Sequence, residues 1–455
     1  MLLKSRSVDA TQGPIAKKII LYVFPLILST LVQRLFNAVD IVVLGNMADT
    51  TAVAAVGATS AIVSLVIDTF VGLSSGTRII FARQFGARDE VRIKKTEDTA
   101  LILGAGLGVA VALAAIFFAR WFLVMTNCDP ECLDAAEKYI IVYAFAAPAI
   151  MLYNFGASVL TSSGDTQRPL YYIIISGFIN VILNVVLCLV LEEKVIAVAV
   201  STAASQLLSA FLVLRRLCKM DGMGKLVIRR MRFSFRYLKK ILQFGLPSAI
   251  THALYPLANL QIQSAINSFG VAAMAGNSAG ATLDGIVGSF SGAFGTTAAT
   301  FMGQNFGANN PERAGKSFKY SMLIGLAVGG SMGFVFFFLS RPVFLPLILG
   351  GDAVALEYGV SRMFWVAAFY WIATINNVLS SVIHAYGYAF LTSFNSIVCI
   401  FGFRMVWMTW IFPANPRFEM LMMCFTASWT LNMIFNTVTA VSVSSVAKRK
   451  GIKQI

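Results

Sequence analysis

The stretch that decides the fold is the first long apolar run, IILYVFPLILSTLVQRLFNAVDIVVL, at residues 19–44. A helix of this length exceeds the roughly 20 residues that cross a hydrocarbon core about 30 Å thick. Comparable runs follow along the rest of the chain. They lie at 53–81, 100–122, 135–160, 169–191, 195–214, 241–266, 272–302, 317–339, 358–385, 390–412 and 420–446. The sequence therefore predicts an all-α polytopic membrane protein with twelve transmembrane helices.

The composition excludes an ordinary soluble protein. Of the 455 residues, 58% are hydrophobic and only 13% are charged, whereas a soluble domain carries about 25% charged residues. A soluble chain of this size would need far more polar surface to cover itself in water. A soluble enzyme and a disordered chain are therefore both excluded, and the lipid bilayer is the expected surrounding.

Basic residues indicate the orientation of the chain, whose formal net charge is +15. If the N-terminus is cytoplasmic, most of them lie in the tails and in the turns after even-numbered helices. The opposite side then carries only Arg120, Lys138, Lys194, Arg341 and Arg417. This bias follows the positive-inside rule. We expect a multi-pass protein of the cell (plasma) membrane, a monomer, with both termini cytoplasmic and no nucleic-acid partner.

The two halves of the chain repeat one another at a nearly constant offset. The matches pair Pro25 with Pro247, Phe85-Gly86-Ala87 with Phe306-Gly307-Ala308, and Gly164 with Gly387. We therefore expect an N-terminal lobe at 1–214, a basic cytoplasmic connection at 215–240, and a C-terminal lobe with a short basic tail at 241–455. Six helices in each repeat make the lobes parallel, and such lobes usually enclose a central cavity and rock to alternate access.

Acidic residues inside apolar runs are costly and indicate function by default. Three of them lie well inside the predicted helices, namely Asp40, Asp68 and Asp284. Asp40 has the most informative context, because Gln33, Asn37 and Asp40 are spaced so that they share one face of their helix.

Two later helices in the same half also carry polar faces. Asn180 and Asn184 lie one turn apart on the fifth predicted helix, and Thr202 lies on the sixth. Three polar faces in one half can converge on a cavity. A carboxylate with amide and hydroxyl neighbours can bind a proton or a small hard cation.

A structural role competes with the functional interpretation of each carboxylate. Asp40 has Arg34 as an alternative partner in an ion pair. For Asp68 and Asp284, cavity lining or coupling and a structural hydrogen bond both remain open. The second half has Ile262 at the position that matches Asp40, so ion chemistry is expected mainly in the N-terminal half.

No cofactor is expected from the motifs. The glycine-rich stretches at 72–76 and 285–295 lack the Gly-Lys-Ser/Thr of a phosphate-binding loop and instead favour close helix contacts. Without a nucleotide site, a proton or sodium gradient drives transport, or transport runs downhill.

Two smaller features have more than one interpretation. Cys128 and Cys132 flank a short acidic loop, where a disulfide in an oxidising compartment and unpaired thiols are both possible. Arg404, near Trp407 and Trp410, favours an interfacial anchor with core aromatics over a stacking or capping group.

In combination, the motifs resemble the multidrug and toxic compound extrusion (MATE) family over nearly the whole chain. They are the Pro25 start, Gln33 with Asn37-Ala38-Val39-Asp40, Gly72-Leu73-Ser74-Ser75-Gly76, Gln84-Phe85-Gly86-Ala87, Ser163-Gly164-Asp165-Thr166 with Pro169, Gly245-Leu246-Pro247, and Gly303-Gln304-Asn305-Phe306-Gly307-Ala308 with Pro311-Glu312-Arg313. The resemblance implies export of drugs and organic cations in exchange for sodium ions or protons.

The resemblance also implies a set of ion-coupling residues. The family's helix-1 aspartate falls on Asp40, and the DinF-like and archaeal branches add an asparagine, an aspartate and a threonine. Asn180 and Thr202 match these positions, but the second aspartate is Asn184 here. The lost charge implies a weak sodium site at most, formed by these four residues.

The same resemblance implies cavity residues and a branch. Tyr255 stands where other branches place a glutamate, which favours the DinF-like branch. Gln33, Phe36 and Asn154 match positions that line the N-lobe cavity of that branch. The predicted substrate cavity thus comprises Gln33, Phe36, Asn37, Asn154, Asp68, Asp284 and Tyr255.

The sequence therefore predicts a secondary active multidrug exporter rather than an enzyme. Its partners would be small-molecule drugs or organic cations. A lipid-linked precursor flippase of the same superfamily is the alternative, and it would show a more cationic cavity and extra helices. A channel-like or sensory membrane protein would have no evident use for the internal repeat and the central carboxylate.

Overall fold

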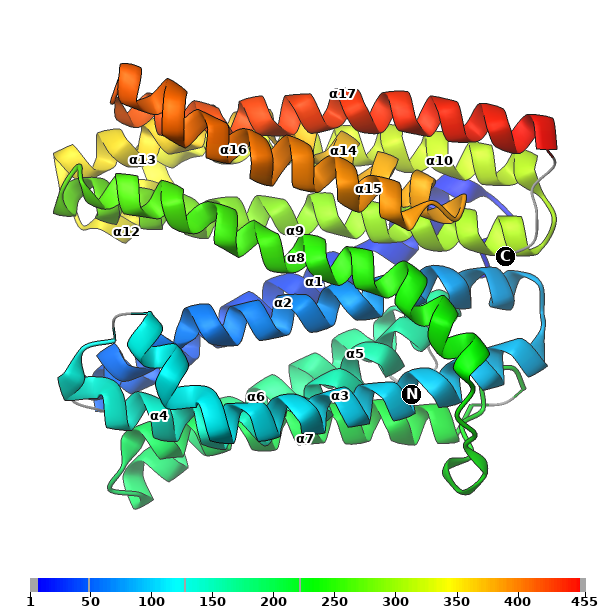
Figure 1. The fold of residues 1–455 in the computed structure, drawn as a ribbon, viewed down its shortest axis with the longest axis horizontal. Coiled ribbons are helices and arrows are strands. Elements are labelled where there is room, and N and C mark those ends of the chain that lie inside the picture. Colours follow the sequence, from blue (N-terminus) through cyan, green and yellow to red (C-terminus); the bar gives the residue numbers. More distant parts are fainter. Residues whose placement is uncertain (1–6, 48–49, 127, 221, 451–455) are drawn as a thin grey trace. The chain divides into compact units, whose positions relative to one another are not determined.

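The computed structural model describes residues 7–47, 50–126, 128–220 and 222–450. The first half of the chain forms long helices joined by short turns (Figure 1). They are α1 Ile15–Met47, α2 Thr50–Gly86, α3 Glu90–Met125, α4 Pro130–Ala144, α5 Ala147–Ser162, α6 Gln167–Val190 and α7 Lys194–Cys218. The pair α4 and α5 forms one rod that is bent by 45°.

The second half repeats this pattern after a short helix, η1 Ile228–Arg230. Its first two helices are α8 Phe235–Asn267 and α9 Val271–Gly307. They are 33 and 37 residues long, the same lengths as α1 and α2. Each of the next three rods contains π-helical or 3₁₀ turns. The first runs from α10 Pro311–Gly325 through η2 Leu326–Gly330, α11 Ser331–Leu339 and η3 Ser340–Phe344 to α12 Leu345–Leu349. The second consists of α13 Ala353–Trp365, η4 Ala367–Phe369 and α14 Tyr370–Ala385, and the third of α15 Ala389–Ser396, η5 Ile397–Gly402, α16 Phe403–Val406, η6 Trp407–Ile411 and η7 Phe412–Ala414. The last helix, α17 Phe418–Lys450, is α-helical throughout.

The length and apolarity of these helices fit a membrane. Among the described residues, nine helices are long and apolar enough to cross a bilayer, or ten when α4 and α5 count as one span. With α8 and α9, which match α1 and α2 in length, they make up the predicted twelve. The all-α polytopic fold class is therefore confirmed.

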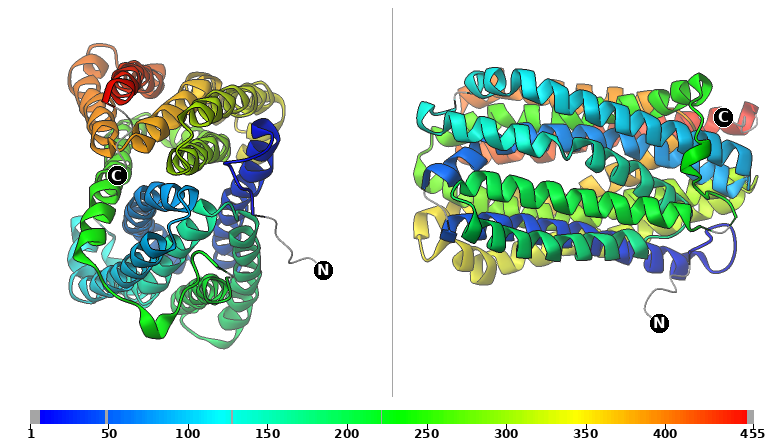
Figure 2. Two further views of the ribbon diagram at one scale, coloured as in Figure 1. Left: turned by 90° about the vertical axis from the view of Figure 1, so that its right-hand side faces the viewer. Right: turned by 90° about the horizontal axis from the view of Figure 1, so that it is seen from below.

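The chain divides into two compact units. Unit 1 comprises Met1–Asp9 and Phe24–Gly245, and unit 2 comprises Ala10–Val23 and Leu246–Ile455. Figure 2 shows the helices of each unit end-on, packed side by side. The segment Ala10–Val23 thus groups with unit 2, whereas the sequence placed it in the N-terminal lobe.

The grouping of Ala10–Val23 follows from contacts near the start of the chain. Arg313 donates hydrogen bonds to the carbonyls of Ala10, Gln12 and Gly13. The reverse holds for α8: its first residues belong to unit 1 and the rest of the helix belongs to unit 2. In each case the helix changes unit next to the matching proline, Pro25 or Pro247.

The repeat extends to local backbone conformation. Arg88 and Asn309 occupy matching positions, and both have a positive φ, 54° and 56°. Each is followed by an N-cap residue whose side chain accepts the backbone N–H three residues on. A cap of this kind satisfies one of the free donors at a helix N-terminus. The two turns before the third rod of each half therefore have the same construction.

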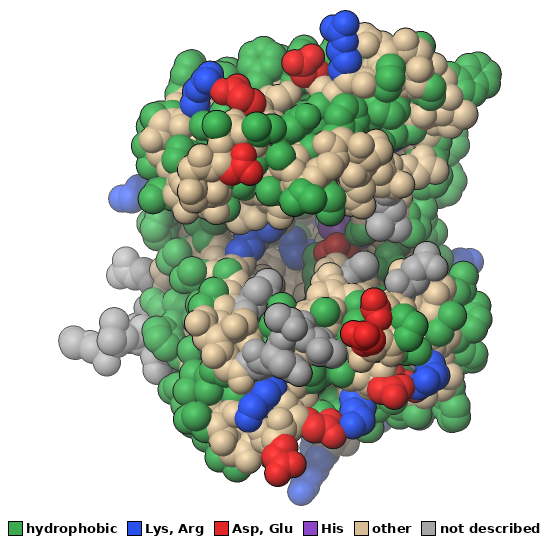
Figure 3. All heavy atoms as spheres, turned by 90° about the vertical axis from the view of Figure 1, so that its left-hand side faces the viewer, with side chains coloured by type: hydrophobic (Ala, Val, Ile, Leu, Met, Phe, Trp, Pro, Cys, Tyr) green, Lys and Arg blue, Asp and Glu red, His purple; other side chains and the backbone are tan. Residues whose placement is uncertain are grey.

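Three of the five basic residues predicted to face outward, Arg120, Lys138 and Arg341, form ion pairs. In unit 1, Arg120 lies 2.8 Å from Asp134 and 2.7 Å from Glu137. In unit 2, Arg341 lies 2.6 Å from Glu357. Figure 3 views the end near α4 in unit 1 and near α12 and α13 in unit 2, where acidic and basic side chains occur next to one another. These exposed pairs neutralise charge locally but contribute little stability.

Candidate functional site

Asp40 lies in the second half of α1 and is half-buried. Its carboxylate accepts a hydrogen bond from the Nδ2 group of Asn184 on α6. Asn184 is fully buried, and its own Oδ1 has no hydrogen-bond partner among the described residues. The amide that donates to the carboxylate therefore has an oxygen without a hydrogen-bond partner among the described residues.

The polar contacts continue from Asn184 across to α7. Asn184 Nδ2 lies 3.4 Å from Asn180 Oδ1, and Asn180 Nδ2 lies 3.5 Å from Thr202 Oγ1. The second distance is at the outer limit for a hydrogen bond. The structure thus brings together Asp40, Asn180, Asn184 and Thr202, the four residues that the sequence singled out for ion coupling.

This arrangement suits the binding of a proton or a small cation. The carboxylate of Asp40, the two amide oxygens and the Thr202 hydroxyl provide oxygen atoms, which hard cations prefer. A protonated Asp40 can instead donate to the free amide oxygen of Asn184 after rotation of the amide, since amide O and N are interchangeable in such networks. Only one of the four residues carries a formal charge.

The ion pairs of the described residues do not join Asp40 to Arg34. Arg34 interacts electrostatically with Asp68, which is half-buried on α2. The described salt bridges do not include Asp40. Asp40 is therefore held by an amide, and the charge of Arg34 acts on Asp68 instead.

The predicted cavity residues of unit 1 differ in their surroundings. Phe36 packs against Gly177 on α6, where an added Cβ would lie 2.0 Å from the ring. The amide of Asn154 donates to the carbonyl of Ile150 in its own helix, at 2.8 Å. Gln33 is exposed. The side chain of Asn37 lies outside the described residues.

In unit 2, Asp284 is buried and forms an ion pair with Arg362, with 2.7 Å between Oδ2 and Nε. Arg362 also donates to Asn277 Oδ1 at 2.6 Å. Tyr255 lies elsewhere, partly exposed on α8. Arg362 was not among the predicted site residues, although its position as a basic residue inside the apolar run 358–385 was a signal that pointed to it.

The environment of Arg404 corrects a further expectation. Its side chain is 1% exposed, so it is not an interfacial anchor. Trp407 is also buried, whereas Trp410 is 77% exposed. Because an arginine is costly to bury in an apolar region, this position requires compensating contacts, which are described below.

Two further kinds of candidate site are metal-binding clusters and the thiols of Cys128 and Cys132. Among the described residues, no group of three or more His, Cys, Asp or Glu side chains could hold a metal ion. The sulfur atoms of Cys128 and Cys132 lie 3.7 Å apart as free thiols.

Comparison with known proteins identifies the family. The MatE family model matches residues 25–186 and 247–410, one stretch in each half of the chain. The chain belongs to the MatE family. The matched stretches begin at the prolines that mark the change of unit, at 25 and 247.

Relatives of this MatE protein carry transport-related names. A probable multidrug resistance protein YpnP of Bacillus subtilis is 25% identical over 382 residues, which is 84% of this chain and 85% of the relative. An FAD transporter of Shewanella oneidensis is 25% identical over 318 residues, covering 68% and 69%. The family and these relatives make the chain a multi-pass membrane transporter of small molecules.

Solved structures share the fold. The crystal structure of MATE in complex with MaL6 superposes with a TM-score of 0.86 at 20% identity, covering 98% of this chain and all of that one. At this identity the likeness supports the fold alone.

Proposed function

We propose that this MatE protein exports organic, mostly cationic compounds in exchange for protons, and that Asp40 is the coupling group. The observation that carries the proposal is the contact between Asp40 and Asn184 in unit 1. A half-buried carboxylate in a membrane helix is energetically costly, and its presence there indicates a functional role. The relative named as a probable multidrug resistance protein supports the class of cargo.

The proposed cycle depends on competition for one charge. When the site is open to the outside, Asp40 accepts a proton, and the loss of negative charge weakens binding of a cationic cargo. After the chain opens inward, Asp40 loses the proton and a new cargo binds. Exchange becomes obligatory because each ligand binds preferentially to one state of the carrier.

Sodium is the weaker candidate for the coupling ion. Asp40 is the only formal charge among the four proposed ligands, since Asn184 replaces a second carboxylate. Neutral amide and hydroxyl oxygens only partly offset the cost of removing water from a sodium ion. A proton needs a single carboxylate.

We further propose a DinF-like branch, a monomer in the plasma membrane, and cytoplasmic termini. The orientation is supported by ten basic residues between Arg215 and Lys240. It is also supported by the paired state of Arg120 and Arg341 at the other end. Basic segments of this kind resist translocation. No cofactor is needed, because the gradient supplies the energy.

The deciding experiment measures efflux of a fluorescent cation from vesicles that contain the purified protein. A proton gradient is imposed first, and a sodium gradient is imposed in a separate preparation. We expect efflux with the proton gradient and little with the sodium gradient. An efflux rate that is independent of both gradients would rule out ion-coupled antiport.

A further inference from the structure

Arg404 on α16 is a buried cation that has no acidic partner in the described part of the chain. Its Nε donates to Ser428 Oγ at 3.1 Å and its NH1 group donates to Asn259 Oδ1 at 2.7 Å. Over the described residues, no carboxylate lies within ion-pair distance of it. The guanidinium has five N–H donors, and these two bonds leave three of them for another acceptor.

The contacts of Arg404 occupy the same place in the repeat as the Asp40 site. In unit 1, that site is built from α1, α6 and α7. In unit 2, the matching rods supply Asn259 from α8, Arg404 from α16 and Ser428 from α17. The two sites differ in the sign of their charge, because one has a carboxylate and the other a guanidinium.

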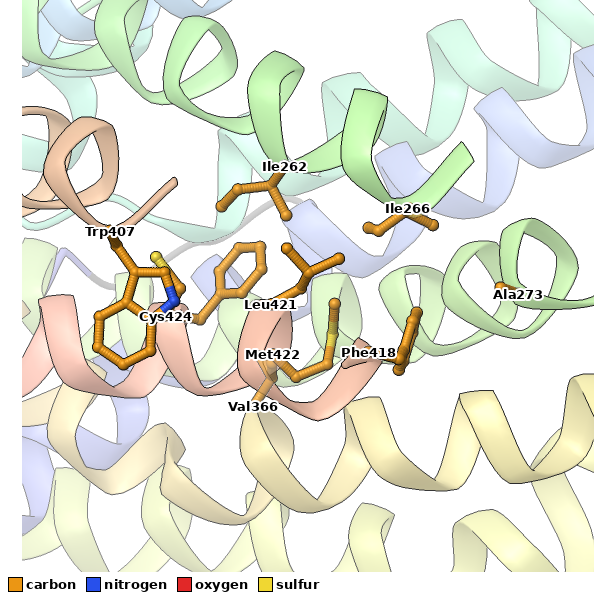
Figure 4. Close-up of a cluster of buried hydrophobic side chains, with 10 residues drawn as sticks. Ile262, Ile266, Ala273, Val366, Trp407, Phe418, Leu421, Met422 and Cys424 are labelled. Carbon is orange, nitrogen blue, oxygen red and sulfur yellow. The ribbon is translucent and has the colours of Figure 1, made fainter. Parts of the chain in front are cut away.

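The position that matches Asp40 is apolar in unit 2. Figure 4 shows Ile262 in a buried cluster with Trp407 and Leu421. Ile262 is 1% exposed and Leu421 is fully buried. This side of the Arg404 site therefore offers no countercharge.

A second arginine adds to the positive charge. Arg362 and Arg404 both lie over the ring of Phe425, with 5.3 Å and 4.5 Å from the guanidinium carbon to the ring centroid. Asp284 pairs with Arg362 and not with Arg404, so one carboxylate stands against two cations. A ring face attracts cations, but it does not neutralise the remaining charge. The cluster thus keeps one uncompensated positive charge at the predicted depth of the membrane.

The site has an exposed approach along α8. Asn259, the acceptor for Arg404, is exposed, and Tyr255 one turn before it is 36% exposed. A small pocket next to them is lined by Tyr255, Thr251 and Ile400, among others. Ile400 lies one turn before Arg404. The pocket residues Tyr255 and Ile400 therefore each lie about one helical turn before a residue of the Arg404 site, Asn259 and Arg404 itself.

We propose that Arg404, with Asn259 and Ser428, forms an anion-binding subsite in unit 2, which takes a carboxylate or phosphate group. The group belongs either to an organic cargo molecule or to a small inorganic ion. Guanidinium is well suited to such oxyanions, because its planar donors match their geometry. The proposal rests on the proposed function only in that small organic molecules enter the carrier.

The test uses two fluorescent dyes that differ in a single group. Rhodamine 110 has a free carboxyl group, and rhodamine 123 is its methyl ester. Their dissociation constants for the purified full chain are measured by fluorescence anisotropy without any ion gradient. We expect the acid to bind more tightly than the ester, and Arg404→Gln to reduce this preference about tenfold, the effect of losing about 1.4 kcal/mol.

Controls separate binding from folding. Arg417→Gln changes an exposed arginine of the same unit and should leave the preference intact. Retained affinity of Arg404→Gln for the ester shows that the variant is folded. If that variant fails to fold, Arg404→Lys, which keeps the charge, should retain a weaker preference for the acid.

Competition identifies the source of the anion. Displacement of the acid but not the ester by inorganic phosphate would show that a small ion occupies the subsite. Acid preference without displacement would show that an organic body is required. Equal binding of acid and ester by the wild type, or an unchanged preference in folded Arg404→Gln, would overturn the proposal. The binding assay needs no gradient, so its result is independent of the efflux experiment. Proton-driven efflux can be observed without a preference for the acid, and a preference for the acid can be observed without proton-driven efflux.

Discussion

The amide of Asn184 donates a hydrogen bond to the carboxylate of Asp40, which lies 144 positions earlier in the chain. This bond connects α6 to the second half of α1. It orients the amide group with its nitrogen toward the carboxylate, and the oxygen of the same amide has no partner among the described residues. The state of Asp40 and the orientation of Asn184 are therefore coupled, and a change at either residue should alter how the other binds an ion.

Replacement of Asp40 by asparagine should abolish proton-coupled export. Asp40→Asn removes the only formal charge of the four-residue site but keeps its size, and Asn184 can still hydrogen-bond to the new amide. The protein should remain folded and inserted. Efflux of a fluorescent cation under a proton gradient is the measurement, with Asp134→Asn as a control at an exposed carboxylate. Efflux at the wild-type rate in Asp40→Asn would contradict the coupling role.

The ion pair in unit 2 should be important for stability. Arg362→Ala leaves the buried Asp284 without its cation. Breaking one side of a buried pair costs about 3–5 kcal/mol, so the thermal midpoint should fall strongly. The double variant Asp284→Asn with Arg362→Gln removes both charges and should recover much of the loss. No recovery would indicate that Arg362 acts through Asn277 or Phe425 instead of through the charge of Asp284.

Close approach of two helices in unit 1 depends on Gly76. A Cβ at this position in α2 would lie 2.3 Å from the carbonyl oxygen of Phe244. Gly76→Ala must therefore push α2 away from the start of α8, at a cost of about 1–3 kcal/mol. Gly57→Ala is the matched control, because its Cβ meets nothing within 4 Å in the same helix. The measurement is the thermal melting midpoint of each variant. Equal midpoints for Gly76→Ala and Gly57→Ala would contradict the close contact at Gly76.

Much of the fold and of the unit 1 site could be predicted from sequence, because both depend on local periodicity. Apolar runs indicate membrane helices without knowledge of their neighbours. Asn180 and Asn184 share a face because they lie one turn apart, and the family resemblance related them to Asp40.

Contacts between distant helices could not be predicted in the same way. Asp284 and Arg362 are 78 positions apart, and their pairing depends on how α13 docks against α9. The sequence favoured Arg404 as an interfacial anchor over a stacking or capping group. Its burial depends on α8 and α17, which supply Asn259 and Ser428. The grouping of Ala10–Val23 with unit 2 likewise depends on Arg313, far along the chain.

The orientation of the chain can be tested at two exposed positions. Arg229 lies in the basic connection and Glu193 in the turn between α6 and α7. In a background with Cys128 and Cys218 replaced by serine, an impermeant maleimide should label Glu193→Cys in intact cells. It should label Arg229→Cys only after the cells are opened, because basic segments stay in the cytoplasm. Labelling of Arg229→Cys in intact cells would show that the orientation is opposite to the one predicted.

The last prediction concerns the choice of ion, which we expect to depend on Asn184. Asn184→Asp should increase the sodium dependence of transport, because it places a second carboxylate beside Asp40. Two carboxylates offset the desolvation of a sodium ion better than one carboxylate and an amide. In the absence of sodium, the two like charges repel, so one of them should hold a proton more tightly than Asp40 does in the wild type.

Two curves decide this prediction, namely transport against sodium concentration at fixed pH in the wild type and in Asn184→Asp. We expect a shallow curve for the wild type and a steep one for the variant. Asn180→Asp is a useful comparison, because Asn180 lies one turn away and contacts Thr202 rather than Asp40. It should have a smaller effect, since its new charge is farther from Asp40. A steep sodium curve for the wild type, with no dependence on pH, would mean that the amide suffices as a sodium ligand, and the proton assignment would then be wrong.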